Sequence, residues 1–171
     1  AAKILFDNLP PHTDPYSEEN ILAITTGPMN GTGAPSSARF NISTISPLTG
    51  LCVSSNSGGD FGLNMKRCGY DGIILRNKSK TPVVLEIGLD GGIVFKDGAP
   101  YMGKLTTEVS DMLGQANIAI GPAGENKVRY AAVMSGERAC GRGGVGAIFG
   151  DKNVKAIAAN GKITSGQIEG G

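Results

Sequence analysis

The spacing of hydrophobic residues predicts a chain built mainly from short β-strands. Residues 39–45, with the sequence RFNISTI, alternate between polar and apolar positions as a half-buried strand does. Similar short apolar runs recur along the chain and are bounded by Gly, Pro, Asn or Ser residues. Asp90-Gly91-Gly92 predicts a hairpin turn. We predict strands over residues 21–25, 39–45, 51–55, 72–76, 83–87, 93–96, 118–120, 127–134 and 154–158.

Helical spacing is confined to a few short segments. We predict helices over residues 1–9, over 61–68 with Gly69 as the C-terminal glycine, and from a cap at Thr106 or Thr107 to Leu113, ended by Gly114. The first helix begins without a capping residue, so we expect the natural polypeptide to extend upstream of Ala1. Because short strands are interrupted by a few short helices, without regular βαβ alternation, an α+β, mostly β fold is predicted.

The two halves of the chain share an order of motifs. Each half reads Gly-Pro, then Arg and an aromatic residue, then a glycine pair that opens a short helix, then an apolar strand ending in Asn. The pairs are Gly27-Pro28 and Gly121-Pro122, Arg39-Phe40 and Arg129-Tyr130, and Gly58-Gly59 and Gly143-Gly144. This order predicts a duplicated, pseudo-two-fold domain whose glycine turns face one elongated ligand. The alternative is chance recurrence in a chain rich in glycine.

Composition restricts the classes of partner. Glycine accounts for 27 of 171 residues, well above the usual share of about 7%. Sixteen basic and fifteen acidic residues give a net charge of +1, which favours neither a nucleic-acid nor a membrane partner. Cys52, Cys68 and Cys140 are odd in number and lack CxxC spacing, which favours a reducing, cytoplasmic compartment. With His12 as the only histidine, they suggest no zinc or iron–sulfur site.

The segment from Arg138 to Gly146 carries the clearest candidate chemistry. Its sequence, RACGRGGVG, holds four glycines and two arginines. Glycine N–H groups can line an anion-binding bend, and guanidinium groups suit phosphate oxygens. The segment formally matches the dinucleotide fingerprint G-x-G-x-x-G. That motif needs a strand directly before it and a long helix after it, and neither is predicted here.

Other polar positions have two interpretations. Arg39 is either a strand-end charge or a ligand-binding residue that follows a loop of Gly, Pro and Ser. Residues 54–57, SSNS, form either a turn or a polar ligand surface beside a glycine pair. Cys140 lies between two arginines whose charge is expected to lower the pKa of its thiol. No pair of carboxylates flanks a motif, and His12 lies in a proline-rich loop, so no catalytic residue is predicted.

Five motifs occur in an order that resembles the N-terminal domain of aldehyde ferredoxin oxidoreductases. They are Ser46–Gly50 (SPLTG), Asn56–Gly59 (NSGG), Gly69–Gly72 (GYDG), Gly121–Asn126 (GPAGEN) and Arg138–Ala147 (RACGRGGVGA). The resemblance covers residues 1–161 and leaves residues 162–171 as a tail or the start of a linker to further domains. It implies an enzyme in which two molybdopterin-type cofactors hold tungsten or molybdenum and oxidise an aldehyde to a carboxylic acid.

The resemblance also implies which positions contact the cofactor. These are Arg39, Asn56, Ser57, Gly58, Arg138, Ala139, Gly141, Arg142 and Gly143. The main-chain carbonyls of Asn56 and Ala139 are expected to hold a Mg²⁺ ion between the two pterin phosphates. Expected partners are the remaining domains with their [4Fe–4S] cluster, ferredoxin as electron acceptor, and a possible second copy. The alternative function is a non-catalytic module that binds another phosphate or nucleotide through the glycine turns.

Overall fold

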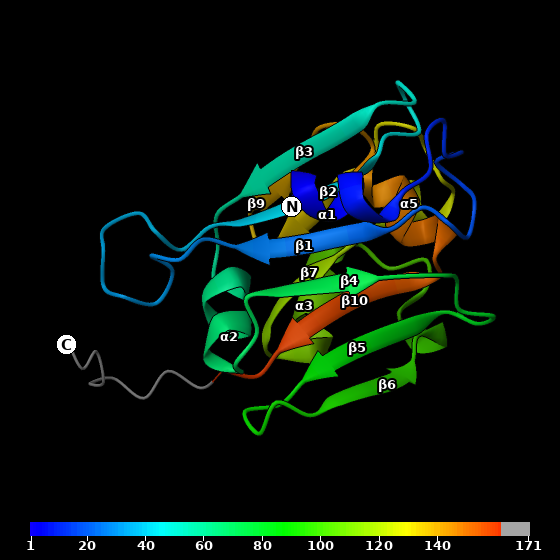
Figure 1. The fold of residues 1–171 in the computed structure, drawn as a ribbon. Helices are drawn as coiled ribbons and strands as arrows, with labels where there is room; N and C mark the ends of the chain where they lie inside the picture. Colours follow the sequence, from blue (N-terminus) through cyan, green and yellow to red (C-terminus); the bar gives the residue numbers. More distant parts are fainter. Residues whose placement is uncertain (162–171) are drawn as a thin grey trace.

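The computed structural model describes residues 1–161, which form ten strands in two sheets (Figure 1). The first sheet has the order β3-β2-β1-β4 and contains β1 (Leu22–Thr26), β2 (Phe40–Ile45), β3 (Cys52–Ser57) and β4 (Gly72–Leu75). The second has the order β6-β5-β10-β7-β8-β9 and contains β5 (Val83–Ile87), β6 (Ile93–Asp97), β7 (Ala116–Ala119), β8 (Val133–Ser135), β9 (Arg138–Cys140) and β10 (Val154–Ala159). The α+β, mostly β prediction is confirmed.

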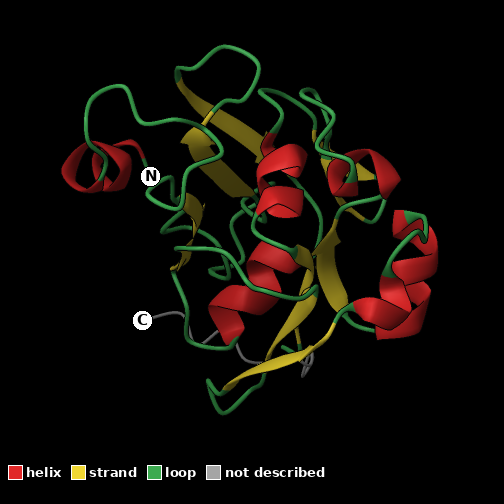
Figure 2. Cartoon of the chain, turned by 90° about the vertical axis from the view of Figure 1, so that its right-hand side faces the viewer, coloured by secondary structure: helices red, strands yellow, loops and turns green. Residues whose placement is uncertain are grey.

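Short helices surround these sheets, and α1 lies apart from the others beside the N-terminus (Figure 2). The helices are α1 (Ala2–Asn8), α2 (Phe61–Arg67), the 3₁₀ helix η1 (Ala99–Tyr101), α3 (Thr106–Leu113), α4 (Pro122–Glu125) and α5 (Val145–Asp151). Over residues 1–161, none of them has the length and apolar character needed to cross a membrane.

The main core lies between the two sheets. Apolar side chains of the first sheet, such as Ile24 and Ile42, are buried in one cluster with Ile118 and Ile157 of the second. Phe40 of β2 and Phe61 of α2 meet edge-to-face with ring centroids 5.4 Å apart. A smaller cluster on the second sheet includes side chains of α3. Each face of the second sheet therefore contributes to a buried cluster.

The strand order repeats one topology twice. The first half runs β1-β2-β3-α2-β4 and the second runs β7-β8-β9-α5-β10. In each half the first strand pairs antiparallel with the second and the last, and the third strand pairs with the second. β5, β6 and α3 stand between the halves in sequence. The glycine pairs before α2 and α5 occupy equivalent places, which supports the predicted duplication over the chance alternative.

The strand predicted over residues 127–134 is wrong over residues 127–132 and is confirmed only at residues 133–134. Lys127 adopts a left-handed φ of 54°, and its N–H bonds to the carbonyl of Gly124 at 2.9 Å. The next N–H, of Val128, bonds to Ala123. Because these groups continue the turn after α4, only residues 133–135 are extended. Arg129 and Tyr130 therefore lie in a turn, and their correspondence with Arg39-Phe40 does not extend to structure.

Two smaller corrections concern the ends of elements. Neither Thr106 nor Thr107 caps α3, because Leu105 is the N-cap and its N–H bonds to a carboxylate oxygen of Glu108 at 2.7 Å. Strand β9 is not among the predicted strands, because its three residues are too few to give a detectable alternation. The hairpin turn at Asp90-Gly91-Gly92 is confirmed by the antiparallel pairing of β5 with β6.

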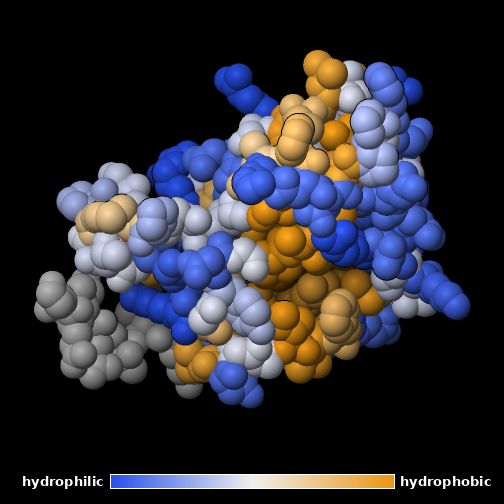
Figure 3. All heavy atoms as spheres, viewed as in Figure 1, coloured by the Kyte–Doolittle hydropathy of each residue, from blue (hydrophilic) through white to orange (hydrophobic). Residues whose placement is uncertain are grey.

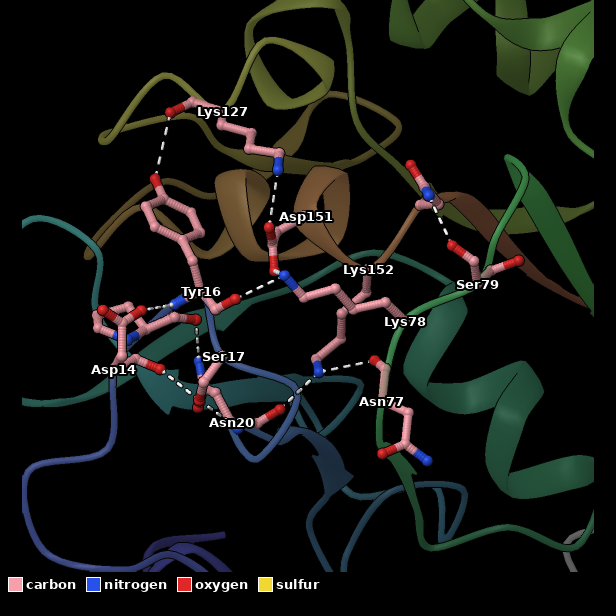
Figure 4. A network of polar contacts seen from close by, with 12 residues as sticks. Asp14, Tyr16, Ser17, Asn20, Asn77, Lys78, Ser79, Lys127, Asp151 and Lys152 are labelled. Atoms are coloured by element: carbon pink, nitrogen blue, oxygen red, sulfur yellow. Dashed lines mark hydrogen bonds and ion pairs between the residues drawn. The ribbon is translucent and has the colours of Figure 1, made fainter.

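A buried polar network fastens the end of α5 to the first half (Figure 4). The Lys152 ammonium donates to the carbonyls of Asn20 and Asn77. The Asp151 carboxylate forms ion pairs with Lys78 and Lys127, each at 2.8 Å. Burial lowers the pKa of Lys152 to about 8, against the nearby negative charge of Asp151, which raises it. Lys152 is therefore costly to bury in its charged form.

We expect Lys152→Met to change how stability depends on pH. The lysine pKa is 10.5 in the unfolded chain and about 8 in the folded one, so between these values the unfolded chain binds more protons. The free energy of unfolding of the natural protein, relative to the variant, should therefore rise from pH 8 to pH 10 and stay level below pH 7. Urea unfolding of both proteins at several pH values across this range measures the difference in their free energies of unfolding. Lys80→Met, at an exposed position outside the network, is the control, and the same rise there would contradict the assignment.

Candidate functional site

The third strands of the two halves, β3 and β9, lie side by side at the edges of their sheets (Figure 1). The Cys140 thiol donates to the Ser55 carbonyl at 3.4 Å. The Arg142 N–H donates to the Ser55 hydroxyl oxygen at 3.2 Å. These two contacts join the strands that carry the predicted cofactor positions, which lie more than 80 residues apart in sequence. The fold thus brings both glycine turns to one place.

A hollow of about 470 Å³ lies where these strands meet. Its lining consists of Ser54, Ser55, Asn56, Ala139, Gly141 and Arg142. Four of the predicted positions are therefore together, including both residues expected to hold Mg²⁺. Amide, hydroxyl and main-chain oxygens are donors that suit this hard cation when phosphates complete its shell. The lining therefore fits a ligand that carries both phosphate and Mg²⁺.

Arg39 is held beside this hollow by its neighbour strand. Its Nε donates to the side-chain oxygen of Asn56, because Arg39 directly precedes β2 and residues 41 and 56 are opposite each other in the β2–β3 pair. A Cβ at Gly58 would stand 3.8 Å from the Arg39 guanidinium. Arg39, Asn56 and Gly58 thus form one cluster, with the arginine exposed to solvent.

The other five predicted positions are outside the hollow's lining: Arg39 and Gly58 lie in the cluster beside it, and the remaining three are Ser57, Arg138 and Gly143. Arg138 lines a neighbouring and larger hollow of about 740 Å³, together with Gly59, Asp60 and the turn after β8. Ser57 is 2% exposed, and its hydroxyl donates to the adjacent carbonyl of Gly58. Sequence reasoning missed the larger hollow because its lining comes from separate segments that share no motif.

The glycines of the two turns differ in their surroundings. A Cβ at Gly143 would lie 2.1 Å from Val53 Cγ2, and one at Gly144 would lie 1.9 Å from the Arg129 carbonyl oxygen. In the first half, a Cβ at Gly59 would lie 2.8 Å from the Ser135 hydroxyl oxygen. These glycines therefore permit close packing, and Gly59 and Gly143 do so between the halves. At Gly141 the nearest atom is 3.8 Å away, so its missing side chain keeps the hollow open.

The expected lowering of the Cys140 pKa is wrong. Burial raises the pKa of this thiol to about 12, against smaller lowering effects of its contact with Ser55 and of the Arg39 charge. Cys140 is fully buried, whereas Arg138 and Arg142 are exposed. The Cys140 thiol is packed in the main core, so the exposed guanidinium groups on either side of it in sequence do not share its surroundings.

No cluster of acidic, cysteine and histidine side chains forms a metal centre within residues 1–161. A cation at the hollow would therefore be bound by main-chain and amide oxygens and by the ligand's own oxygens. Arg39 and Arg142 supply positive charge at this place, which suits an anionic ligand.

Comparison with known proteins shows that the chain is similar to oxidoreductases. A family model described as aldehyde ferredoxin oxidoreductase, N-terminal domain, matches residues 1–161. The tungsten-containing aldehyde ferredoxin oxidoreductase of Pyrococcus horikoshii is 47% identical over 165 residues, which are 92% of this chain and 27% of that protein. An aliphatic sulfonate oxidoreductase, WOR-like subunit, of Pyrococcus furiosus is 39% identical over 168 residues, 86% of this chain and 26% of that protein.

A solved structure has the same fold. The active site complex BamBC of benzoyl coenzyme A reductase, in complex with 1,5 dienoyl-CoA, contains a chain with a TM-score of 0.90 and 39% identity. The match covers 94% of this chain and 26% of that one. The chain therefore spans about a quarter of the length of the relatives that it matches.

We expect Gly144→Ala to be much more damaging than Gly141→Ala. At Gly144 the new Cβ would clash with the Arg129 carbonyl at a left-handed φ of 68°, so the free energy of unfolding should fall by about 3 kcal/mol. At Gly141 no atom is close, and stability should stay within about 0.5 kcal/mol. Urea unfolding measures both variants. If the two variants lost equal amounts of stability, the assignment of Gly144 to close packing would be contradicted.

We also expect the thiols to differ in reactivity. Cys52 is exposed, whereas Cys68 and Cys140 are buried, and burial keeps the Cys140 thiol protonated at pH 8. A thiol-specific reagent at this pH should modify Cys52 rapidly and the other two only in urea. Mass spectrometry of the labelled peptides identifies the sites. Rapid labelling of Cys140 in the folded protein would contradict its buried position.

Proposed function

The chain belongs to the aldehyde ferredoxin oxidoreductase family, and on this basis we propose that it seats the pterin cofactor of a tungsten-dependent oxidoreductase. One observation carries the proposal: β3 and β9, equivalent strands of the duplicated halves, border one hollow. A ligand with two similar phosphate-bearing halves matches a site made from two similar strands. When bound, such a cofactor supplies the metal centre at which an aldehyde is oxidised to a carboxylic acid.

The chain's own residues position and neutralise this ligand. Arg39 and Arg138, one from each half and both exposed, are proposed to bind pterin and phosphate groups, with Arg142 adding a third guanidinium. Asn56 orients the Arg39 side chain through its hydrogen bond. The carbonyls of Asn56 and Ala139 are proposed to hold Mg²⁺ between two phosphates. Gly58 and Gly141 allow the ligand to approach the main chain, whereas Gly143, whose Cα packs against Val53, is proposed to contact the ligand through its main-chain N–H.

Ser57 is proposed to act through its main chain and not through its side chain. Its side chain is buried, so its contact with the cofactor would come from the main chain. The hydroxyl holds the adjacent Gly58 carbonyl at 3.2 Å. We propose that this bond fixes the path of the first glycine turn as it leaves β3.

The full enzyme is proposed to extend beyond the residues described. Downstream domains would provide the substrate pocket and a [4Fe–4S] cluster that passes electrons to ferredoxin, and two copies would associate. The tungsten-containing relatives favour tungsten over molybdenum. The relatives carry different names, for aldehyde, aliphatic sulfonate and benzoyl-CoA chemistry, so the substrate is decided outside this chain. Three free cysteines favour a reducing compartment such as the cytoplasm.

A second candidate is a phosphate- or nucleotide-binding module without catalysis. It is favoured by the chemistry of the hollow, whose lining carries no carboxylate and no histidine. Binding there requires only glycine turns and arginines. The two candidates differ in whether the intact protein carries tungsten and pterin phosphate.

We expect elemental analysis of the intact protein to find tungsten with about two phosphorus atoms per metal, as a bis-pterin cofactor requires. Absence of both elements would reject the pterin proposal. Arg39→Ala combined with Arg138→Ala should lower cofactor occupancy, since each lost charge-assisted contact costs about 1.5–3 kcal/mol. Arg67→Ala, at the exposed end of α2, is the matched control and should retain full occupancy. Unchanged occupancy in the double variant would exclude both arginines as phosphate ligands.

A further inference from the structure

Asn30 is a buried polar residue that the proposed function does not use. It lies in the loop between β1 and β2, which Figure 1 shows at the end of the first sheet where β3 leads into α2. The residue is 1% exposed, and its Nδ2 donates to the main-chain carbonyl of Arg39 at 3.2 Å. Its Oδ1 is buried and has no hydrogen-bond partner among the residues that the structure describes. A buried amide that makes only part of its hydrogen bonds is costly, so stability alone does not explain it.

The Asn30 amide lies over the first turn of α2. A Cβ at Gly62 would stand 3.1 Å from Asn30 Nδ2 and 3.2 Å from the Arg39 carbonyl oxygen. The glycine pair at residues 58–59 lies just before this helix. One hydrogen bond therefore joins three parts of the candidate site: the loop, the residue before β2, and the helix that follows the first glycine turn.

The second half repeats the turn around Asn30 without the amide. In each half a Gly-Pro turn follows the first strand, and the N–H of its fourth residue bonds to the carbonyl of its first. Asn30 bonds in this way to Gly27 at 3.1 Å, and Gly124 bonds to Gly121 at 2.9 Å. Gly124 is therefore the equivalent of Asn30, and it has no side chain to place over α5.

The position of Arg39 also differs in the second half. Arg39 directly precedes β2, and Ala132 directly precedes β8. A Cβ at Gly146, the second residue of α5 as Gly62 is of α2, would stand 2.5 Å from the Ala132 carbonyl oxygen. There the main chain bonds by itself, because the Gly146 N–H donates to the Ala131 carbonyl at 2.9 Å.

This comparison separates what the fold needs from what the candidate site needs. Strand and helix approach each other equally closely in the second half, where no asparagine is present. The half that lacks the asparagine also lacks the arginine. The amide of Asn30 and the guanidinium group of Arg39 therefore occur together, which links the amide to the arginine and not to the packing of the helix.

The Arg39 side chain is fixed at its other end by Asn56. Its Nε donates to the Asn56 side-chain oxygen, a bond that does not use the two terminal nitrogens of the guanidinium group. Such a pair of nitrogens can donate two parallel hydrogen bonds to one phosphate. Because one asparagine holds the main chain of Arg39 and another holds its Nε, the group has a set direction before a ligand arrives, which reduces the ordering that binding requires.

We propose that Asn30 is a positioning residue for Arg39. It holds the main chain of Arg39 so that the guanidinium group is presented beside the hollow to a phosphate group, and it does not touch the ligand because it is buried. The identity of the phosphate-bearing ligand rests on the proposed function, whereas the hold on Arg39 does not.

Side-chain NMR tests this hold without any ligand. In the 171-residue chain the Arg39 Nε–H signal, identified by its loss in Arg39→Lys, should show the positive heteronuclear NOE of an ordered group. Asn30→Ala should reduce this NOE to the value of the exposed Arg67. Asn30→Gly, which copies the residue of the second half, should do the same and guards against loss of folding in the alanine variant. An Arg39 NOE that stays unchanged in both variants would overturn the proposal.

Asn20→Ala is the matched control for the NMR experiment. Asn20 is also fully buried, and its Nδ2 donates to a main-chain carbonyl, that of Pro15, at 2.7 Å. Its removal should leave the Arg39 NOE unchanged. An equal loss of NOE in this control would show that any loss of packing loosens Arg39, and would overturn the specific role of Asn30.

The rate of cofactor loss tests what the hold is used for. In the intact protein Asn30→Ala should raise the rate of tungsten loss on dilution by about threefold to tenfold, the factor that one hydrogen bond gives. When Arg39→Ala is already present, Asn30→Ala should raise the rate no further, because it acts through Arg39. The same factor in both backgrounds would overturn the proposal. A natural protein without tungsten and pterin phosphate would reject the proposed function instead, and the NMR result alone would then decide the hold on Arg39.

Discussion

The close approach of the two halves at their glycine turns is the constraint on which the rest of the structure depends. Gly143 lies against Val53, and Gly59 lies against Ser135, in each case where a Cβ would clash. Each half thus provides the glycine that admits a strand of the other. Because β3 and β9 approach this closely, polar groups from both halves reach a common hollow. A side chain at either glycine would separate the strands and the candidate binding residues with them.

Burial divides the residues of each turn between packing and binding. Along β9, Cys140 points into the core, while Arg138 and Ala139 remain exposed. Along β3, Ser55 and Ser57 point inward, while Ser54 and Asn56 face solvent. The inward residues join the halves through the contacts of Ser55. Exposed groups on a rigid, shared base are well suited to hold a large ligand in one orientation.

The same duplication explains both the proposed site and the apolar side chains that β4 and β6 leave exposed (Figure 3). At one end of the sheets, equivalent strands meet and make a surface with pseudo-two-fold character. At the other end, the halves are unequal, because β10 has the β5–β6 hairpin beside it and β4 has no equivalent within residues 1–161. The apolar side chains exposed at this end follow from that inequality. These exposed apolar side chains are therefore explained by the packing of the sheets and not by the chemistry of a ligand.

The sequence by itself determined most of the local structure and the family. Alternation in residues such as 40–45 predicts strands, and motifs such as NSGG and GRGG are local, so both are visible without a fold. Only the tertiary structure decided that Gly143 and Gly144 serve packing, that Cys140 is buried with a raised pKa, and that Arg129 lies in a turn. The packing of the glycines and the burial of the thiol depend on atoms contributed by distant segments, such as Val53 and Ser55. No pattern within a single segment records such neighbours.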